Sequence, residues 1–172
     1  VVPVGEDDNA ERISTGLSSG IMRSLERTLG KESYPVLETF VEDIVSASSI
    51  IVRGEGEAES YSALLRESIE KFYPEKKTIW KPQGEEEADL CLAVSITGKE
   101  KLTMDSISRV VFAGGKADVI SANPQSLISK AATNAIQVSD ELFFKGDEHI
   151  LGKFSILAVI EILTVLMGKD KV

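Results

Sequence analysis

Residues 88–95 read ADLCLAVS, and the five residues from Leu90 to Val94 are all apolar. An apolar run of this length between polar residues predicts a strand that is buried on both faces. A polar loop follows it, and then a helical pattern over residues 103–113. Because strand, loop and helix in this order form the repeating unit of a parallel sheet, this stretch decides the fold class.

The same alternation continues on both sides of this strand. Further strands are expected at residues 49–53, 78–80, 117–121 and 135–138. Helices are expected at residues 60–72, 103–113, 124–132 and 151–167. Short apolar strands separated by helices predict a three-layer α/β/α sandwich around a roughly five-stranded parallel sheet.

Two amphipathic helices are predicted before the first strand. Over residues 7–29 apolar side chains recur at every fourth position, which places them on one helical face. These are Ile13, Leu17, Ile21, Leu25 and Leu29. A second helix is expected over residues 34–46. For a chain of 172 residues we expect one domain over residues 1–172, with leading helices in 1–47 and the α/β core and closing helix in 48–172.

The composition argues against several classes of partner. A net charge of -9 disfavours a nucleic-acid surface, which needs clustered Lys and Arg. The apolar segment 154–167 is too short to span a membrane and contains Glu161. The single cysteine, Cys91, has no partner for a disulfide or a metal site, and the first residues lack the pattern of a signal peptide. We therefore expect a cytoplasmic protein with no cofactor and no metal.

The best candidate for an anion site is the loop after the central strand, over residues 95–103. It combines the hydroxyls of Ser95, Thr97 and Thr103 with Gly98 and two lysines. Amides at a helix N-terminus bind phosphate without net positive charge, so this loop suits a phosphate monoester. The structural alternative is an ordinary helix start, with Thr103 capping the first turn.

Two other loops lie at the carboxyl ends of predicted strands. Gly54 and Gly56 would let the backbone approach the sugar part of a ligand, although three glutamates accompany them. The structural alternative is a tight turn before a helix. In the third loop Asn123 is expected as N-cap and Pro124 as the first helical residue, and Ser121 could contact a sugar hydroxyl.

The only histidine, His149, lies in a predicted polar loop just before the closing helix. Interconversion of an aldose and a ketose needs a group with a pKa near neutrality to move protons, and histidine has one. His149 is therefore the candidate catalytic residue. The alternative is a surface histidine without a catalytic role.

Taken in order, these loops resemble the SIS (sugar isomerase) domain family, and within it the 6-phospho-3-hexuloisomerases of archaea and bacteria. The most similar stretches are residues 88–95 and residues 119–126, VISANPQS. The resemblance extends over about residues 34–167. It implies a flavodoxin-like α/β/α fold, a sugar-phosphate ligand and assembly into homodimers or homotetramers.

The match to the family's loops is uneven. Gly54 and Gly56 stand at the glycines of its first loop, whereas Ala58 replaces a serine. Ser95, Thr97 and Gly98 match parts of its Ser-Gly-Ser-Gly-Glu-Thr loop.

Two departures in the matched loops concern the chemistry directly. Lys99 and Glu100 stand at the loop's final Glu-Thr, and Thr103 is expected in the threonine's role. Ser155 stands where the hexuloisomerases carry the glutamate expected as catalytic base.

These observations leave three hypotheses. The first is a phosphosugar-binding protein with the SIS fold, either an isomerase with altered catalytic groups or a binder alone. The second is a catalytically inactive regulatory or assembly module that responds to a sugar phosphate. The third, a nucleotide-binding doubly wound domain, is weaker because Glu59 replaces the third small residue of the dinucleotide fingerprint. Apolar surface on the leading and closing helices predicts a homo-oligomer.

Overall fold

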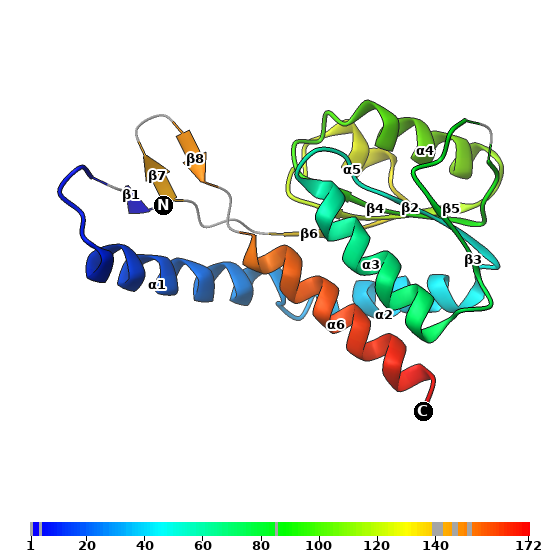
Figure 1. The fold of residues 1–172 in the computed structure, drawn as a ribbon, viewed down its shortest axis with the longest axis horizontal. Coiled ribbons are helices and arrows are strands. Elements are labelled where there is room, and N and C mark those ends of the chain that lie inside the picture. The colour runs from blue at the N-terminus through cyan, green and yellow to red at the C-terminus, as the bar shows by residue number, and fades with distance from the viewer. Residues whose placement is uncertain (1, 4, 85, 139–142, 146–147, 151–152) are drawn as a thin grey trace.

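Five parallel strands form the central sheet in the computed structural model (Figure 1). In their order across the sheet they are β3 (Lys77–Trp80), β2 (Ser49–Arg53), β4 (Leu90–Ser95), β5 (Lys116–Ser121) and β6 (Asn134–Gln137). All six residues of β4 are buried, as the apolar run predicted. The structure describes residues 2–3, 5–84, 86–138, 143–145, 148–150 and 153–172, and of 2–3, 143–145 and 148–150 only the backbone.

Helices cover both faces of this sheet, which confirms the predicted α/β/α sandwich (Figure 1). One face carries α2 (Ser33–Ser46), α3 (Ala58–Phe72) and α6 (Phe154–Asp170), and the other carries α4 (Lys101–Phe112) and α5 (Leu127–Ala131). Alternate side chains of β4 divide between them. Leu90, Leu92 and Val94 pack with the first group, and Cys91 and Ala93 with the second.

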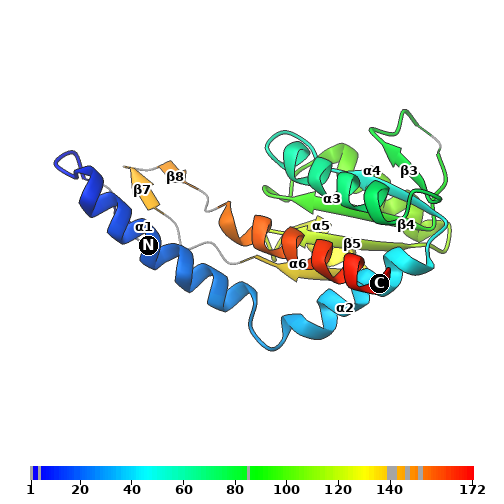
Figure 2. The same ribbon diagram turned by 60° about the horizontal axis from the view of Figure 1, so that its bottom comes forward.

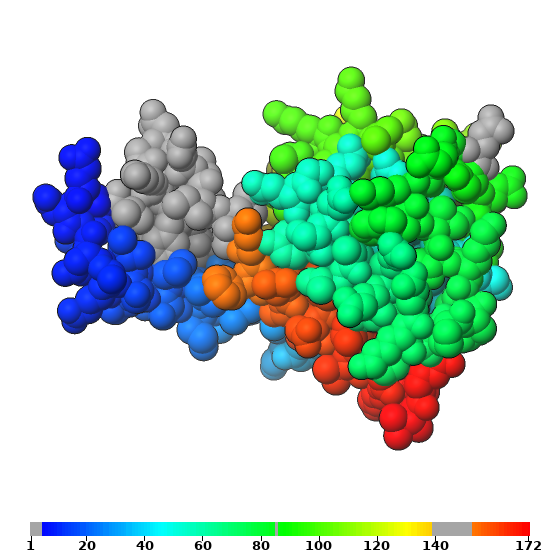
Figure 3. All heavy atoms as spheres, in the orientation of Figure 1, coloured from blue at the N-terminus to red at the C-terminus, as the bar shows by residue number. Residues whose placement is uncertain are grey.

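The first helix, α1 (Ala10–Thr28), extends beyond the sheet (Figures 1 and 2). Asn9 caps it by accepting a hydrogen bond from the amide of Arg12 at 3.0 Å. The apolar side chains that recur at every fourth position of α1 are only half-buried. In the space-filling view α6, orange to red, lies between α3 and the two leading helices (Figure 3).

A second, three-stranded sheet was not predicted. It consists of β1 (Val2–Pro3), β7 (Phe143–Lys145) and β8 (Glu148–Ile150), with β1 parallel to β7 and β7 antiparallel to β8. The predicted polar loop that contains His149 is therefore part of a hairpin. Strands of two or three residues are too short to show an apolar run or a period that would distinguish them from a loop.

Two predicted helix starts were wrong. α5 begins at Leu127, and Ser126, not Asn123, caps it by accepting a hydrogen bond from the amide of Ser129. Pro124 therefore precedes the helix instead of opening it. α4 begins at Lys101, so Thr103 lies inside the first turn and is not its cap.

The strand order reverses between β2 and β4, since the chain runs from β2 outward to β3 and then returns to β4. In open parallel sheets ligands bind at such a switch point, outside the carboxyl ends of the strands. The loops after β2 and β4 are therefore the first place to look for a site. None of the helices that the structure describes has the length and apolarity needed to cross a membrane.

Candidate functional site

The loops after β2 and β4 meet at the switch point and enclose a pocket of about 250 Å³. One wall is formed by Glu55, Gly56 and Glu57, and the other by the segment from Ile96 to Glu100. The structure thus brings together two loops that the sequence assigned to one site. Three glutamates line this small pocket, so its surface is more acidic than a phosphate site requires.

The carboxylate of Glu100 occupies the donors of the predicted phosphate loop. Its Oε1 accepts hydrogen bonds from the amides of Ile96 at 2.9 Å and Thr97 at 3.0 Å. Its Oε2 accepts one from the hydroxyl of Ser95 at 2.9 Å. Burial alone would raise the pKa of Glu100, but these bonds, together with its own amide, lower it below the usual value. Three donors therefore converge on one bound anion, and that anion is part of the chain.

A second carboxylate crosses between the loops. Glu55 accepts hydrogen bonds from the amide and from the hydroxyl of Thr103, the latter at 2.9 Å. The amide of Thr103 is one of those at the start of α4 that have no partner within the helix. Glu55 satisfies it, and a negative charge is favourable at a helix N-terminus.

The predicted hydroxyl ligands differ in their access to solvent. Ser95, Thr103 and Ser121 are fully buried, whereas Thr97 is exposed. The hydroxyl of Ser121 is held within its own loop, where it donates to the carbonyl oxygen of Asn123 at 3.1 Å. Of these four side chains, only that of Thr97 meets solvent directly.

The three predicted glycines have different roles. At Gly98, with φ of 76°, a Cβ would lie 2.2 Å from Cβ of Ser126, so only glycine fits. At Gly54 a Cβ would lie 2.4 Å from the carbonyl oxygen of Ala58, where α3 begins. Protein atoms therefore fill the space beside both. Gly56, with φ of 57°, has open space beside it and lines the pocket.

The candidate catalytic position is only partly described. The backbone of His149 lies in β8 opposite Phe144, and its side chain lies outside the described residues. Ser155 is 1% exposed in the first turn of α6. A serine hydroxyl does not act as a base by itself. The catalytic glutamate that the resemblance to the hexuloisomerases implies is therefore absent from this position.

Glu100 and Arg53 lie at the site but were not predicted from the sequence as site residues. The spacing of Thr97 and Glu100 matches the capping-box pattern, in which a glutamate accepts a hydrogen bond from the amide three residues earlier. This pattern could have indicated Glu100. Arg53 ends β2, is 8% exposed and lines a second pocket of about 560 Å³ between the ends of β2 and β3. A charged residue after an apolar strand was the only signal for it.

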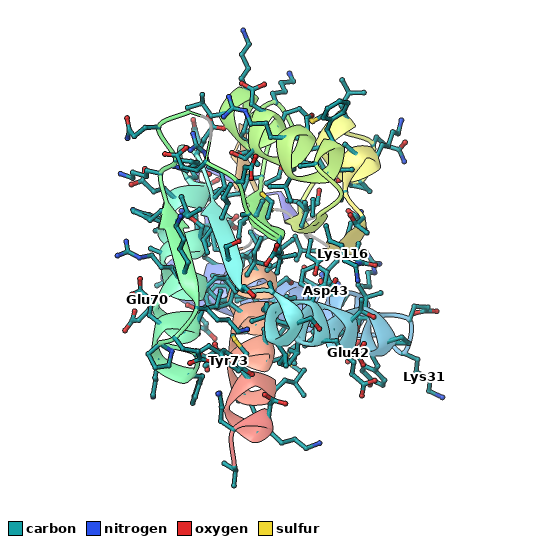
Figure 4. The ribbon with its side chains drawn as sticks, turned by 90° about the vertical axis from the view of Figure 1, so that its right-hand side faces the viewer. Lys31, Glu42, Asp43, Glu70, Tyr73 and Lys116 are labelled. Carbon is teal, nitrogen blue, oxygen red and sulfur yellow. The ribbon has the colours of Figure 1, made fainter. Side chains whose placement is uncertain are left out.

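A polar network lies at the opposite, amino end of the sheet. Lys116 pairs with Asp43 at 2.8 Å (Figure 4), and the amide of Asn134 donates to Asp43 at 3.2 Å and to Asp118 at 2.9 Å. Burial, and then the neighbouring Asp43, raises the pKa of Asp118 to about 8. Because it lies away from the carboxyl ends of the strands, we interpret this network as structural.

Comparisons with known proteins give matches in structure alone. No family model matches the chain. No curated protein matches it either. The sugar isomerase domain of the RpiR transcription factor from Sphaerobacter thermophilus aligns with a TM-score of 0.77 and 16% identity, over 93% of this chain and 92% of that one.

Two further solved structures extend the likeness. The Vibrio vulnificus NanR protein, complexed with ManNAc-6P, gives a TM-score of 0.70 and 18% identity over 96% of this chain and 64% of that one. A hypothetical protein from Methanococcus jannaschii, with an inferred function of 3-hexulose-6-phosphate isomerase, gives 0.69 and 14% over 93% and 90%. The chain therefore has the fold that the sequence resemblance predicted, that of the sugar isomerase domains.

Proposed function

We propose that this chain is a sugar-phosphate-binding module with the SIS fold that does not isomerise its ligand. The observation that supports it is the convergence of the Ser95 hydroxyl and the Ile96 and Thr97 amides on the carboxylate of Glu100. Donors arranged in this way bind an oxyanion. The NanR protein, whose structure is similar, is complexed with ManNAc-6P, and the oxyanion of that ligand is a phosphate group.

In this proposal the ligand competes with Glu100. A phosphate reaches the three donors only when the glutamate side chain leaves them, so the apparent affinity falls by the fraction of time that the loop is open. Glu55 and Glu57 add repulsion to a doubly charged phosphate. The module would therefore respond to a sugar phosphate at high concentration, as suits a sensor better than a storage protein.

The absence of isomerisation follows from Ser155. The buried serine stands where the resembling hexuloisomerases carry their expected base, and its hydroxyl cannot take a proton from a sugar carbon at neutral pH. His149 and the glutamates Glu55, Glu57 and Glu59 are the other candidates for this base. We expect no ketose–aldose interconversion of fructose 6-phosphate. Turnover that disappears in His149→Ala would show instead that the chain is an isomerase.

Thermal unfolding with increasing ManNAc-6P tests the binding. We expect a small rise in the unfolding midpoint of the unaltered chain and a several-fold tighter response of Glu100→Thr, which removes the competing carboxylate and supplies a hydroxyl. Glu57→Gln removes a charge from the same pocket without freeing any donor, so its gain should be smaller. If neither the unaltered chain nor Glu100→Thr responds at millimolar ligand, the loop is not a phosphate site.

We also propose that the module is a homodimer or homotetramer. The apolar side chains along α1 are half-exposed, and α1 extends away from the sheet, so a second copy could cover this face (Figure 2). We further propose that residues 1–172 form one domain and that the protein works in a reducing, cytoplasmic compartment. The second rests on the buried free thiol of Cys91.

A further inference from the structure

Arg53 is a buried cation that has no carboxylate partner among the residues that the structure describes. It ends β2 and is 8% exposed, and its Nη1 donates one long hydrogen bond, 3.5 Å, to the carbonyl oxygen of Pro82. None of the ion pairs found within the described ranges of the chain involves it. A guanidinium has five N–H donors. None of the Arg53 nitrogens is a buried atom without a partner among the described residues, so its other donors are open to the pocket that it lines.

This arrangement leaves a guanidinium available to a ligand in the pocket. A buried charge loses its hydration, and proteins usually compensate with a carboxylate and several hydrogen bonds. The neighbouring cation shows the usual solution, because Lys81 lies 2.6 Å from the carboxylate of Glu59. Arg53 thus offers a planar, two-pronged donor to an anion that comes from outside the chain.

The space in front of Arg53 suits a small molecule. The pocket measures about 560 Å³, within the range of ligand sites, and lies beside the switch point at the ends of β2 and β3. The indole of Trp80 forms part of its wall, with the Arg66 guanidinium 5.2 Å from the ring centroid. Aromatic rings in such walls pack against the apolar faces of sugar rings.

We propose that this pocket binds a sugar acid, with its carboxylate paired to Arg53 and its ring against Trp80. This pocket shares Glu55 and Gly56 with the smaller pocket beside the Ser95–Glu100 loop, but the proposal does not depend on the function proposed above. Glu55 and Glu59 line the same pocket and would accept hydrogen bonds from the sugar hydroxyls.

The charges of the pocket select a monoanion over a phosphate. Lys81 and Glu59 neutralise each other, so Arg53 and Glu55 remain, with Glu55 turned to Thr103. A single carboxylate matches Arg53, the one unpaired cation among the described residues that line this pocket. A phosphate monoester carries nearly two negative charges at neutral pH and would add a further charge beside two glutamates.

Trp80 is the only tryptophan in the chain, so its fluorescence reports on this pocket directly. We expect D-glucuronate to change the Trp80 emission in a saturable way, D-glucose to have no effect, and glucose 6-phosphate to bind several-fold more weakly than glucuronate. Arg53→Met should weaken glucuronate binding by at least about tenfold, because it removes a charge-assisted pair. Arg53→Lys, which keeps the charge but loses the fork, should weaken it less.

Controls separate this site from folding and from the phosphate loop. Arg53→Met should fold, since replacing an unpaired buried charge by an apolar chain relieves its desolvation; far-UV circular dichroism checks this, and Arg53→Lys serves if it fails. Lys77→Met should change glucuronate affinity by less than about threefold, because Lys77 is exposed at the opposite end of β3 and does not line the pocket. Glu100→Thr should leave it unchanged. Equal binding of glucose, unaltered binding in a folded Arg53→Met, or no response to glucuronate would each overturn the proposal.

Discussion

Glu55, in the loop after β2, accepts hydrogen bonds from both the amide and the hydroxyl of Thr103, which lies 48 residues later in the first turn of α4. The pair joins the two loops that flank the switch point. Because the helix start is capped by a residue from another loop, the shape of the pocket and the stability of α4 depend on the same carboxylate.

Glu55→Ala should destabilise the fold by about 1–2 kcal/mol, the usual cost of losing a helix cap with a buried donor left unsatisfied. Urea unfolding measures the change. Glu57→Ala is the matched control, because Glu57 is exposed and has no side-chain capping hydrogen bond. Its effect should stay within about 0.5 kcal/mol. Equal losses in both variants would show that Glu55 does not hold the two loops together.

The charge of Glu100 should make stability depend on pH in the acid range. Its pKa is lowered in the folded chain relative to the ordinary value of 4.5. The stability that it contributes is therefore present above about pH 4.5 and is lost as the pH falls through the folded pKa. Glu100→Gln should flatten the fall of the unfolding midpoint below about pH 4.5 relative to the unaltered chain. Parallel pH profiles would mean that the three donors do not stabilise the charged form.

The fold could be predicted because its signals are local. The apolar run of β4 predicted a strand buried on both faces, and the spacing of Leu17 and Ile21 predicted α1. Both patterns follow from the period of a single element, which neighbours in space do not alter. The small sheet was missed because its strands are too short to show a period.

The site could be predicted only in outline. The sequence placed the loops after β2 and β4 together, but no pattern in it indicated that Glu55 would bond Thr103. Nor did it indicate that Arg53 would be buried with no carboxylate partner in the described part of the chain. Asn123 shows the reason. Its side-chain amide donates to the carbonyl oxygen of Thr97 at 3.0 Å, a contact between loops that outweighed its local preference for a helix cap.

Asp118→Asn should stabilise the chain at alkaline pH. Burial and the neighbouring Asp43 raise the pKa of Asp118 from 3.8 to about 8, so the folded chain holds a proton that the unfolded chain releases. The stability linked to that proton is complete below about pH 3.8 and declines as the pH rises through about 8. The amide does not titrate, so the gain of the variant in unfolding midpoint over the unaltered chain should grow from about pH 4 to about pH 8 and stay constant above that. Asp105→Asn, at an exposed position of α4, should show no such gain.

Leu17→Glu should dissociate the proposed oligomer. Leu17 lies in the half-buried apolar row of α1, and a charge there would have to be buried at an interface between copies. Light scattering during size exclusion should give an oligomer for the unaltered chain and a monomer for the variant. Ser18→Glu adds the same charge at the next, exposed position of α1 and should leave the oligomer intact. A monomeric unaltered chain would refute the proposal.

Gly98→Ala should cost more stability than Gly56→Ala, although both glycines have positive φ, 76° and 57°. The conformational cost of about 1 kcal/mol is common to the two substitutions. Only at Gly98 does the new Cβ meet protein, 2.2 Å from Cβ of Ser126, whereas beside Gly56 the space is open. The difference in free energy of unfolding, expected at about 1–3 kcal/mol, isolates the contact between the loops after β4 and β5. Equal losses would mean that the two loops separate without cost in free energy. The donors around Glu100 would then not depend on the loop after β5.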